Sequence, residues 1–159
     1  MKLYTSYFYQ IRFFAPNIVP VSTAVWDPKW YHNFAGQDNV FLDKRGVVNG
    51  LRAPALAPGS QLEGACAGKD GTAVGCTHNP STCAFLKGYT DQLNRLDCDD
   101  YVRRLENLGS RVKRITSFEG EPVIVLIVYE APDNPCSERA VLQQWLSTNG
   151  YAISEWRRL

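Results

Sequence analysis

The chain has 159 residues, of which 45% are hydrophobic and 12% aromatic, so we expect one α/β domain (residues 1–159) with an apolar core. Its 17 basic and 16 acidic residues leave a net charge of +1, which argues against a general polyanion binder and leaves only local basic patches open. No segment approaches the roughly 20 apolar residues of a membrane span, and the first residues carry no signal-peptide pattern. A cytoplasmic protein without membrane contact is expected.

The first part of the chain predicts short strands. Residues 3–9 are rich in β-forming side chains and fit a first strand, and residues 19–25 fit a second. Pro20 must lie at the start of this second strand or on an edge of the sheet, because proline cannot donate to a strand ladder. Residues 40–42 and 51–56 are weaker strand candidates, separated by a turn-like Lys-Arg-Gly sequence.

Two helices are predicted next. Asn79 followed by Pro80 is typical of a helix start, and apolar residues recur at helical spacing over residues 85–96. A second helix is predicted to begin near Asp99, because acidic side chains suit the positive end of the helix dipole. Its apolar stripe runs over residues 101–112, and basic residues follow in its last turns.

A strand–loop–helix unit follows. Residues 122–129 form a continuous apolar, β-branched run, typical of a strand buried on both faces. After a short polar loop, Asn134 and Pro135 predict the start of an amphipathic helix that ends before Gly150, and residues 152–156 fit a last strand. Because strands alternate with helices, we predict an open, mainly parallel α/β sheet with helices on both faces, plus a long Cys/Gly-rich loop.

This unit also predicts a site, because ligands of open α/β sheets collect at the carboxyl ends of strands, near helix N-termini. With Pro135 as the first helical residue, Cys136 would lie where free N–H groups and the helix dipole stabilise a thiolate or an anion. Glu130, Ser137 and Arg139 would join it as catalytic residues, Glu130 as acid or base and Arg139 holding an anion such as phosphate. The alternative is a half-buried structural thiol, since no histidine lies nearby in sequence to act as its base.

The cysteine-rich loop is a second candidate site. Five cysteines without a secretory signal suggest reduced thiols, metal ligands or a reactive residue rather than a disulfide framework. Three thiolates and one imidazole would complete a tetrahedral zinc site: Cys66, Cys76, His78 and Cys83. A metal would also order a loop that has little apolar surface to pack. The alternatives are an iron–sulfur cluster with Cys98 or Cys136 as a fourth thiolate, or ordinary surface residues.

Aromatic and polar side chains flank two of the predicted strand ends. They are Tyr4, Ser6, Trp26, Lys29, Trp30 and Tyr31. Such residues can stack a base or line a small-molecule pocket, so we predict that they contact a ligand. Burial in the core is the alternative, especially for Tyr4.

Residues 126–132, residues 135–139, Trp145 and Gly150 together resemble the C-terminal half of the bacterial and phage "domain of unknown function 488" family. Residues 3–7, 21–28 and 56–58 are also similar to that family, and the Cys-rich loop is similar to a phage-type branch. The family's hallmark is a strand ending in Glu, then Cys-His-Arg and a helix. Here Ser137 replaces that His, and Arg139 lies one place later. The resemblance implies a Rossmann-like fold with a pocket at the strand ends.

These observations lead to two hypotheses of different classes. In the first, the chain is an enzyme or enzyme-like domain that acts on a nucleotide, nucleobase or nucleic acid at the strand-end pocket. In the second, it is a non-catalytic module, phage-encoded or not, that binds a nucleotide or a protein partner through a metal-ordered loop. Only the first hypothesis requires the pocket residues to converge on one cleft.

Overall fold

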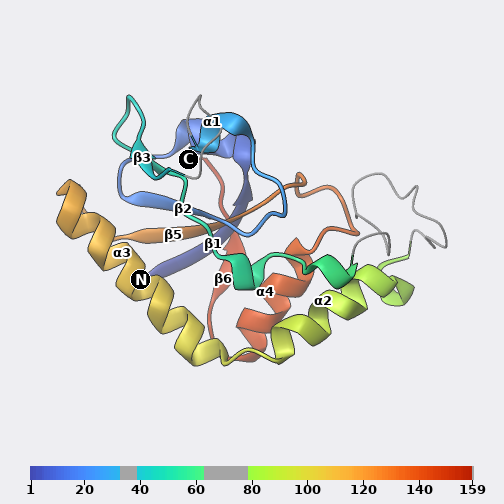
Figure 1. Ribbon diagram of the computed structural model, residues 1–159. Helices are drawn as coiled ribbons and strands as arrows, with labels where there is room; N and C mark the ends of the chain where they lie inside the picture. The colour runs from blue at the N-terminus through green and yellow to red at the C-terminus, as the bar shows by residue number, and fades with distance from the viewer. Residues whose placement is uncertain (33–38, 63–78, 159) are drawn as a thin grey trace.

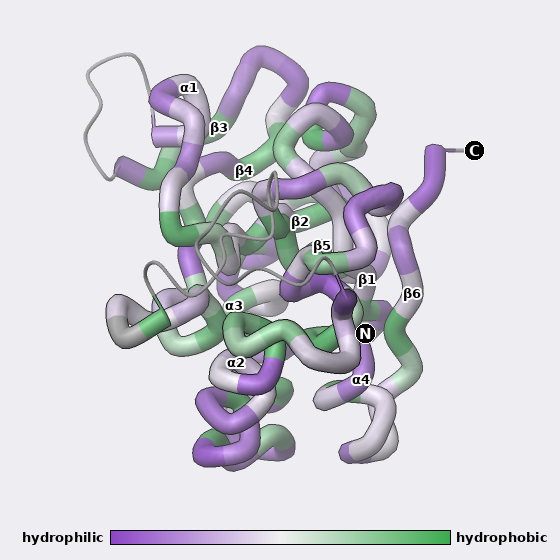
Figure 2. The backbone as a smooth tube through the Cα atoms, turned by 90° about the vertical axis from the view of Figure 1, so that its right-hand side faces the viewer, coloured by the Kyte–Doolittle hydropathy of each residue, from purple (hydrophilic) through white to green (hydrophobic). Residues whose placement is uncertain are grey.

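A parallel sheet forms the centre of the computed structural model, which describes residues 1–32, 39–62 and 79–158. The strands are β1 (Lys2–Tyr7), β2 (Ile18–Ser22), β5 (Val123–Val128) and β6 (Ile153–Glu155). They lie in the order β2-β5-β1-β6, every pairing is parallel, and Figure 2 shows them following one another across the view. The predicted open α/β sheet of the Rossmann-like type is confirmed.

The two strands with the clearest sequence signals take the places that their sequences predict. From Ile124 to Val128 every residue of β5 is buried, because helices cover one face of the sheet and a second layer covers the other. Strand β2 lies at an edge of the sheet and forms its ladder with β5 alone. Pro20 is therefore tolerated within β2, since an edge strand needs donors on one side only.

Three helices cover one face of the sheet, below the strands in Figure 1: α2 (Ala84–Asn94), α3 (Cys98–Thr116) and α4 (Arg139–Thr148). The side chain of Asp97 caps α3 by accepting a 3.0 Å hydrogen bond from the backbone N–H of Asp100. Gly109 lets α3 approach β5 closely, because a Cβ there would lie 3.1 Å from Pro122 and 3.3 Å from Ile124. Helix α4 ends at Thr148, before Gly150 as predicted, and the φ of +93° at Gly150 suits glycine.

Shorter elements cover the opposite face. They are the 3₁₀ helix η1 (Phe8–Phe13), the single turn α1 (Lys29–His32), and the antiparallel pair β3 (Phe41–Leu42) and β4 (Val48–Asn49). Figure 1 shows them above the strands. Phe8, Ile11 and Phe14 turn inward from η1 and pack with Val125 and Ile127 of β5. Both faces of the central strands are buried in this way. The carboxyl ends of the strands are therefore where we look for a site.

Some predicted boundaries differ from the structure. Strand β1 ends at Tyr7, because the chain turns there into η1, and β2 ends at Ser22 rather than at residue 25. Residues 51–56 are not a strand: Arg52 makes one isolated bridge to Ser22, and Pro54–Leu56 form the 3₁₀ helix η2. Two further 3₁₀ turns, η3 (Ser60–Leu62) and η4 (Pro80–Thr82), precede α2. Within the described ranges, no helix is both long and apolar enough to cross a membrane.

Candidate active site

The carboxyl ends of β1 and β5 mark a switch point in the sheet. From β1 the chain crosses one face through η1 toward β2, whereas from β5 it crosses the other face through α4 toward β6. This divergence is the place where open α/β proteins bind ligands. The strand register sets Tyr7 beside Val128, so the residues that follow these two are the first candidates for a site.

Glu130, two residues beyond the end of β5, is the centre of a buried polar cluster. Its Oε2 accepts a 3.0 Å hydrogen bond from Ser137 Oγ, and its carboxyl group is also hydrogen-bonded to that of Glu138. The three residues are 8%, 2% and 3% exposed, respectively. The loop after β5 therefore folds back so that two carboxyl groups meet beneath the strand end.

The surroundings of Glu138 favour its protonated form. Burial raises its pKa from 4.5 to about 8, and the charge and hydrogen bond of Glu130 add to this rise, while Arg139 opposes it. Desolvation has this effect because it penalises the charged form of a carboxyl group. Two adjacent carboxyl groups that share one proton are a recurrent arrangement for acid–base chemistry.

Arg139 ties the cluster to the far edge of the sheet. Its Nη2 donates a 2.6 Å hydrogen bond to the backbone oxygen of Glu130, and its Nε lies 2.7 Å from Glu155 Oε1 on β6. Glu155 also accepts a 2.8 Å hydrogen bond from Thr5 on β1. Because Glu155 balances the charge of Arg139, the expectation that this guanidinium holds a phosphate loses its basis. The described cluster carries net negative charge.

The predicted helix start at Pro135 is wrong. Helix α4 begins at Arg139, and Asn134 instead caps a turn, where its Oδ1 accepts a 2.9 Å hydrogen bond from the N–H of Cys136. Asn favours such local turns as strongly as it favours helix caps, so the Asn-Pro pair was ambiguous. Cys136 is half-buried and lies outside the first turn of α4, and the argument for a dipole-stabilised thiolate therefore fails.

A cavity of about 320 Å³ opens beside this cluster. It is lined by Tyr129, Glu130, Ala131, Asp133 and Asn134. Glu130 is thus the member of the carboxyl pair that a ligand can reach, and Glu138 lies buried next to it. The volume suits a group the size of a nucleobase or a sugar rather than a large ligand.

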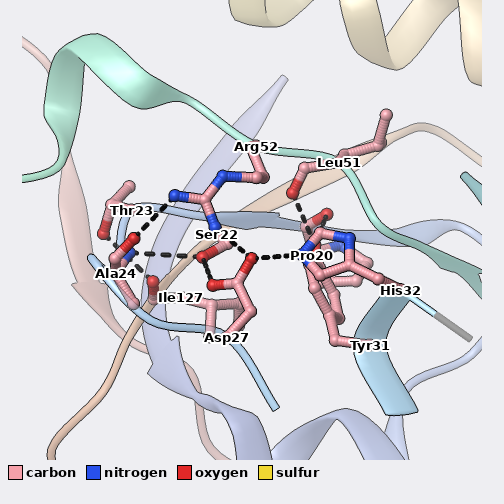
Figure 3. Close-up of polar contacts among 10 residues, drawn as sticks. All are labelled: Pro20, Ser22, Thr23, Ala24, Asp27, Tyr31, His32, Leu51, Arg52 and Ile127. Carbon is pink, nitrogen blue, oxygen red and sulfur yellow. Dashed lines mark hydrogen bonds and ion pairs between the residues drawn. The ribbon is translucent and has the colours of Figure 1, made fainter. Parts of the chain in front are cut away.

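A second polar cluster lies at the end of β2, one strand further along the edge (Figure 3). The carboxylate of Asp27 accepts hydrogen bonds from Ser22 Oγ and Arg52 Nη1, and it lies 2.6 Å from His32 Nε2. The Asp27 side chain is 1% exposed, so these three partners replace the water that a buried polar group loses. Arg52 Nη2 also donates to the backbone oxygen of Ala24 at 3.0 Å. The cluster fixes the segment after β2 against the segment after β4.

The structure separates the aromatic and polar residues predicted to contact a ligand. Tyr31 is fully buried and donates to the backbone oxygens of Pro20 (3.1 Å) and Leu51 (2.7 Å), so it belongs to the core. Burial raises its pKa far above the usual range for tyrosine. Trp26 and Trp30 are 71% and 43% exposed.

The other three residues of that set also differ in burial. Lys29 is exposed beside the two tryptophans, Tyr4 is half-buried, and Ser6 is fully buried. Trp26, Lys29 and Trp30 therefore stay candidates for ligand contact, and direct contact by Ser6 would require the site to open.

Most of the predicted metal site lies outside the described residues. This applies to Cys66, Cys76 and His78, whereas Cys83 is buried immediately before α2. Among the residues that the structure does describe, no group of three or more His, Cys, Asp or Glu side chains is arranged to hold a metal. Zinc binding by the four predicted ligands, or an iron–sulfur cluster, stays a prediction.

Sequence reasoning missed several members of both clusters. Asp27 and His32 stand in the polar stretch after a predicted strand, which was a usable signal for a site at its carboxyl end. Glu138 was not among the predicted catalytic residues, although it lies between Ser137 and Arg139 in sequence. Arg52 and Glu155 carry no local signal, because each reaches its cluster from a distant part of the chain.

Comparison of the chain with models of protein families, with curated proteins and with solved structures finds no match in any of the three. The structure defines the class as a Rossmann-like α/β protein with a four-stranded parallel sheet. The resemblance to the "domain of unknown function 488" family stays a prediction.

Proposed function

We propose that the chain is an enzyme that acts on a nucleotide, nucleobase or nucleic acid by acid–base chemistry at the end of β5. The observation that carries this proposal is the carboxyl pair: Glu130 lines the cavity, and Glu138 holds a proton beside it at neutral pH. A pair of this kind can take a proton from one group and return it to another without a metal or a histidine.

The roles of the neighbouring residues follow from their contacts. Glu130 is the proposed catalytic residue, because its carboxyl borders the cavity. Glu138 and Ser137 are positioning residues: Glu138 supplies the shared proton, and Ser137 fixes Glu130 Oε2 by its hydrogen bond. Arg139 holds the backbone of Glu130 from α4.

The charge of the site favours one part of the proposed substrate. The positive charge of Arg139 is already paired with Glu155, so the carboxylate of Glu130 sets the sign of the field in the cavity. A carboxylate attracts hydrogen-bond donors and repels phosphate. The amino group of a base or a hydroxyl group of a sugar therefore fits beside Glu130, and phosphate groups fit further out.

The test is to incubate the purified chain with nucleosides, nucleotides and short oligonucleotides and to measure their turnover by chromatography. Glu130→Gln keeps an oxygen to accept from Ser137, so the fold should survive while the rate falls about 10²- to 10⁴-fold. The matched control is Asp133→Asn, because Asp133 lines the same cavity but is exposed. Full activity of the Glu130 variant would refute the proposed reaction centre.

A non-catalytic binding module is the second candidate, and one observation favours it. Ser137 Oγ and the Nη2 and Nε atoms of Arg139 contact other groups inside the protein, and Glu130 is the one member of the described cluster that lines the cavity. Tight nucleotide binding by wild type and by Glu130→Gln, with no turnover by either, would select this alternative.

A further inference from the structure

The chain presents an exposed surface of aromatic rings and arginines just beyond β1. We call it the aromatic–arginine surface, and it consists of Tyr7, Tyr9, Arg12, Phe13 and Arg158. Tyr9 is 51% exposed, and Arg12 and Arg158 are both exposed. An exposed ring of this size next to unburied cations has no role in the core, so its chemistry points outward.

The spacing of residues in η1 builds this surface. A 3₁₀ helix has three residues per turn, so side chains three apart share one side. Phe8, Ile11 and Phe14 take the inward side and are buried. Tyr9 and Arg12 share an outward side, where Arg12 Nε donates a 3.0 Å hydrogen bond to the backbone oxygen of Tyr9.

The rings and guanidinium groups of the surface touch one another. Tyr7 and Tyr9 stack with centroids 6.4 Å apart and an interplanar angle of 17°, and Phe13 meets Tyr9 edge-on at 6.0 Å. The guanidinium of Arg12 lies 3.9 Å from the Tyr9 centroid, and that of Arg158 lies 4.2 Å from the Phe13 centroid. These contacts fix both the rings and the cations before any ligand arrives.

The charge of the surface is unbalanced. Neither Arg12 nor Arg158 forms an ion pair within the parts of the chain that the structure describes, and Arg157 adds a further exposed cation next to Arg158. The nearest acidic residue in sequence, Glu155, is paired with Arg139. The surface therefore complements a polyanion, although the whole chain is close to neutral at +1.

We propose that the aromatic–arginine surface binds single-stranded nucleic acid, with bases stacked on Tyr9 and its neighbours and phosphates held by Arg12 and Arg158. Every base has a π-face, so aromatic stacking beside cations is the usual means of binding single strands without sequence preference. A duplex hides these faces and is expected to bind more weakly.

The position of the surface links it to the proposed reaction centre. Tyr7 lies beside Val128 in the sheet register. Val128 ends β5 and is followed by Tyr129, which is half exposed, and by Glu130. The surface and the cavity therefore both follow the carboxyl ends of neighbouring strands. This assignment of substrate class rests on the proposed function for its reaction, but the binding itself can be tested separately.

The test is fluorescence anisotropy with 5′-labelled 12-nucleotide oligo-dT and oligo-U, and with a 12-base-pair duplex, at several salt concentrations. We expect the single strands to bind better than the duplex and affinity to fall as salt rises, with a slope of about −0.7 per phosphate contact. Tyr9→Ala should weaken binding about 10-fold or more, because one stacked base is lost, whereas Tyr9→Phe should not. Arg158→Ala should weaken binding and reduce the salt slope by about 0.7.

Matched controls lie on the other face of the molecule. Ile115 and Arg111 are an exposed apolar residue and an exposed cation on α3, so Ile115→Ala and Arg111→Ala should leave binding unchanged. No binding at 50 mM salt, equal binding of duplex, or equal losses in the α3 variants would overturn the proposal. Turnover of small nucleosides by a chain that binds no single strand would refute this inference and leave the proposed function standing.

Discussion

The shared proton at Glu138 predicts how the stability of the protein depends on pH. The pKa of Glu138 is 4.5 in an unfolded chain and about 8 in the folded one, because it is buried beside Glu130. The folded state therefore binds more protons than the unfolded state between these values. The free energy of unfolding must fall as pH rises through that window, and the contribution of Glu138 is fully present only below pH 4.5. A displacement of this size corresponds to about 5 kcal/mol.

Glu138→Gln removes this dependence, because glutamine stays neutral at every pH while it keeps the size of the side chain. We would measure urea unfolding of wild type and variant at pH 5, 7 and 9. Titrating groups that do not interact with Glu138 cancel in the difference between the two proteins. Relative to the variant, wild type should lose about 3–5 kcal/mol of unfolding free energy between pH 5 and pH 9.

The reasoning fails if the difference between wild type and Glu138→Gln is the same at pH 5 and pH 9. Glu119, an exposed carboxylate just after α3, supplies the control. The variant Glu119→Gln should follow the wild-type pH profile within about 0.5 kcal/mol, because surface substitutions of this kind have small effects.

The remaining predictions concern the Asp27 cluster and the metal. Asp27→Asn should lower the unfolding free energy by about 3 kcal/mol, measured by urea unfolding, because it leaves the charge of Arg52 and the ring of His32 without their buried carboxylate. Elemental analysis should find one zinc per chain, and Cys83→Ser should release it with a fall in melting temperature.

Controls for these two predictions come from the same chain. Asp100 forms exposed ion pairs on α3, so Asp100→Asn should change stability by less than about 1 kcal/mol. An equal loss in both aspartate variants would contradict the role given to Asp27. Cys98 is buried but stands outside the four predicted zinc ligands, and Cys98→Ser should keep the zinc. Less than roughly 0.2 metal per chain after chelator-free purification would refute the zinc site.

Local patterns were enough to predict a parallel α/β sheet and the positions of its four strands along the chain. The run that became β5 had no polar residue to place on a solvent face, so burial on both sides followed from the sequence alone. Pro20 predicted the start of a strand or an edge, and the amphipathic pattern of α4 predicted a buried face, on which Leu142, Trp145 and Leu146 lie. These signals depend on residues that are neighbours in sequence, which is why they could be read.

The sequence predicted where the candidate site lies but not which of its residues contact one another. Asn134 caps a turn rather than a helix, and only the folded loop separates these two uses of the same residue. Arg52 reaches Asp27 across 25 residues, and Glu155 meets Thr5 across 150. No periodicity or spacing rule connects such pairs, since their meeting depends on the order of strands in the sheet.

The bridge between Thr5, Glu155 and Arg139 has a consequence for folding kinetics. It joins the first and last strands, 150 residues apart in sequence, to the residue that holds the backbone of Glu130. Contacts of such high sequence separation form late, because closing a long loop costs chain entropy before any contact repays it. The contacts of Glu155 with Arg139 and Thr5 at the proposed reaction centre should therefore form late in folding, once the first and last strands have met.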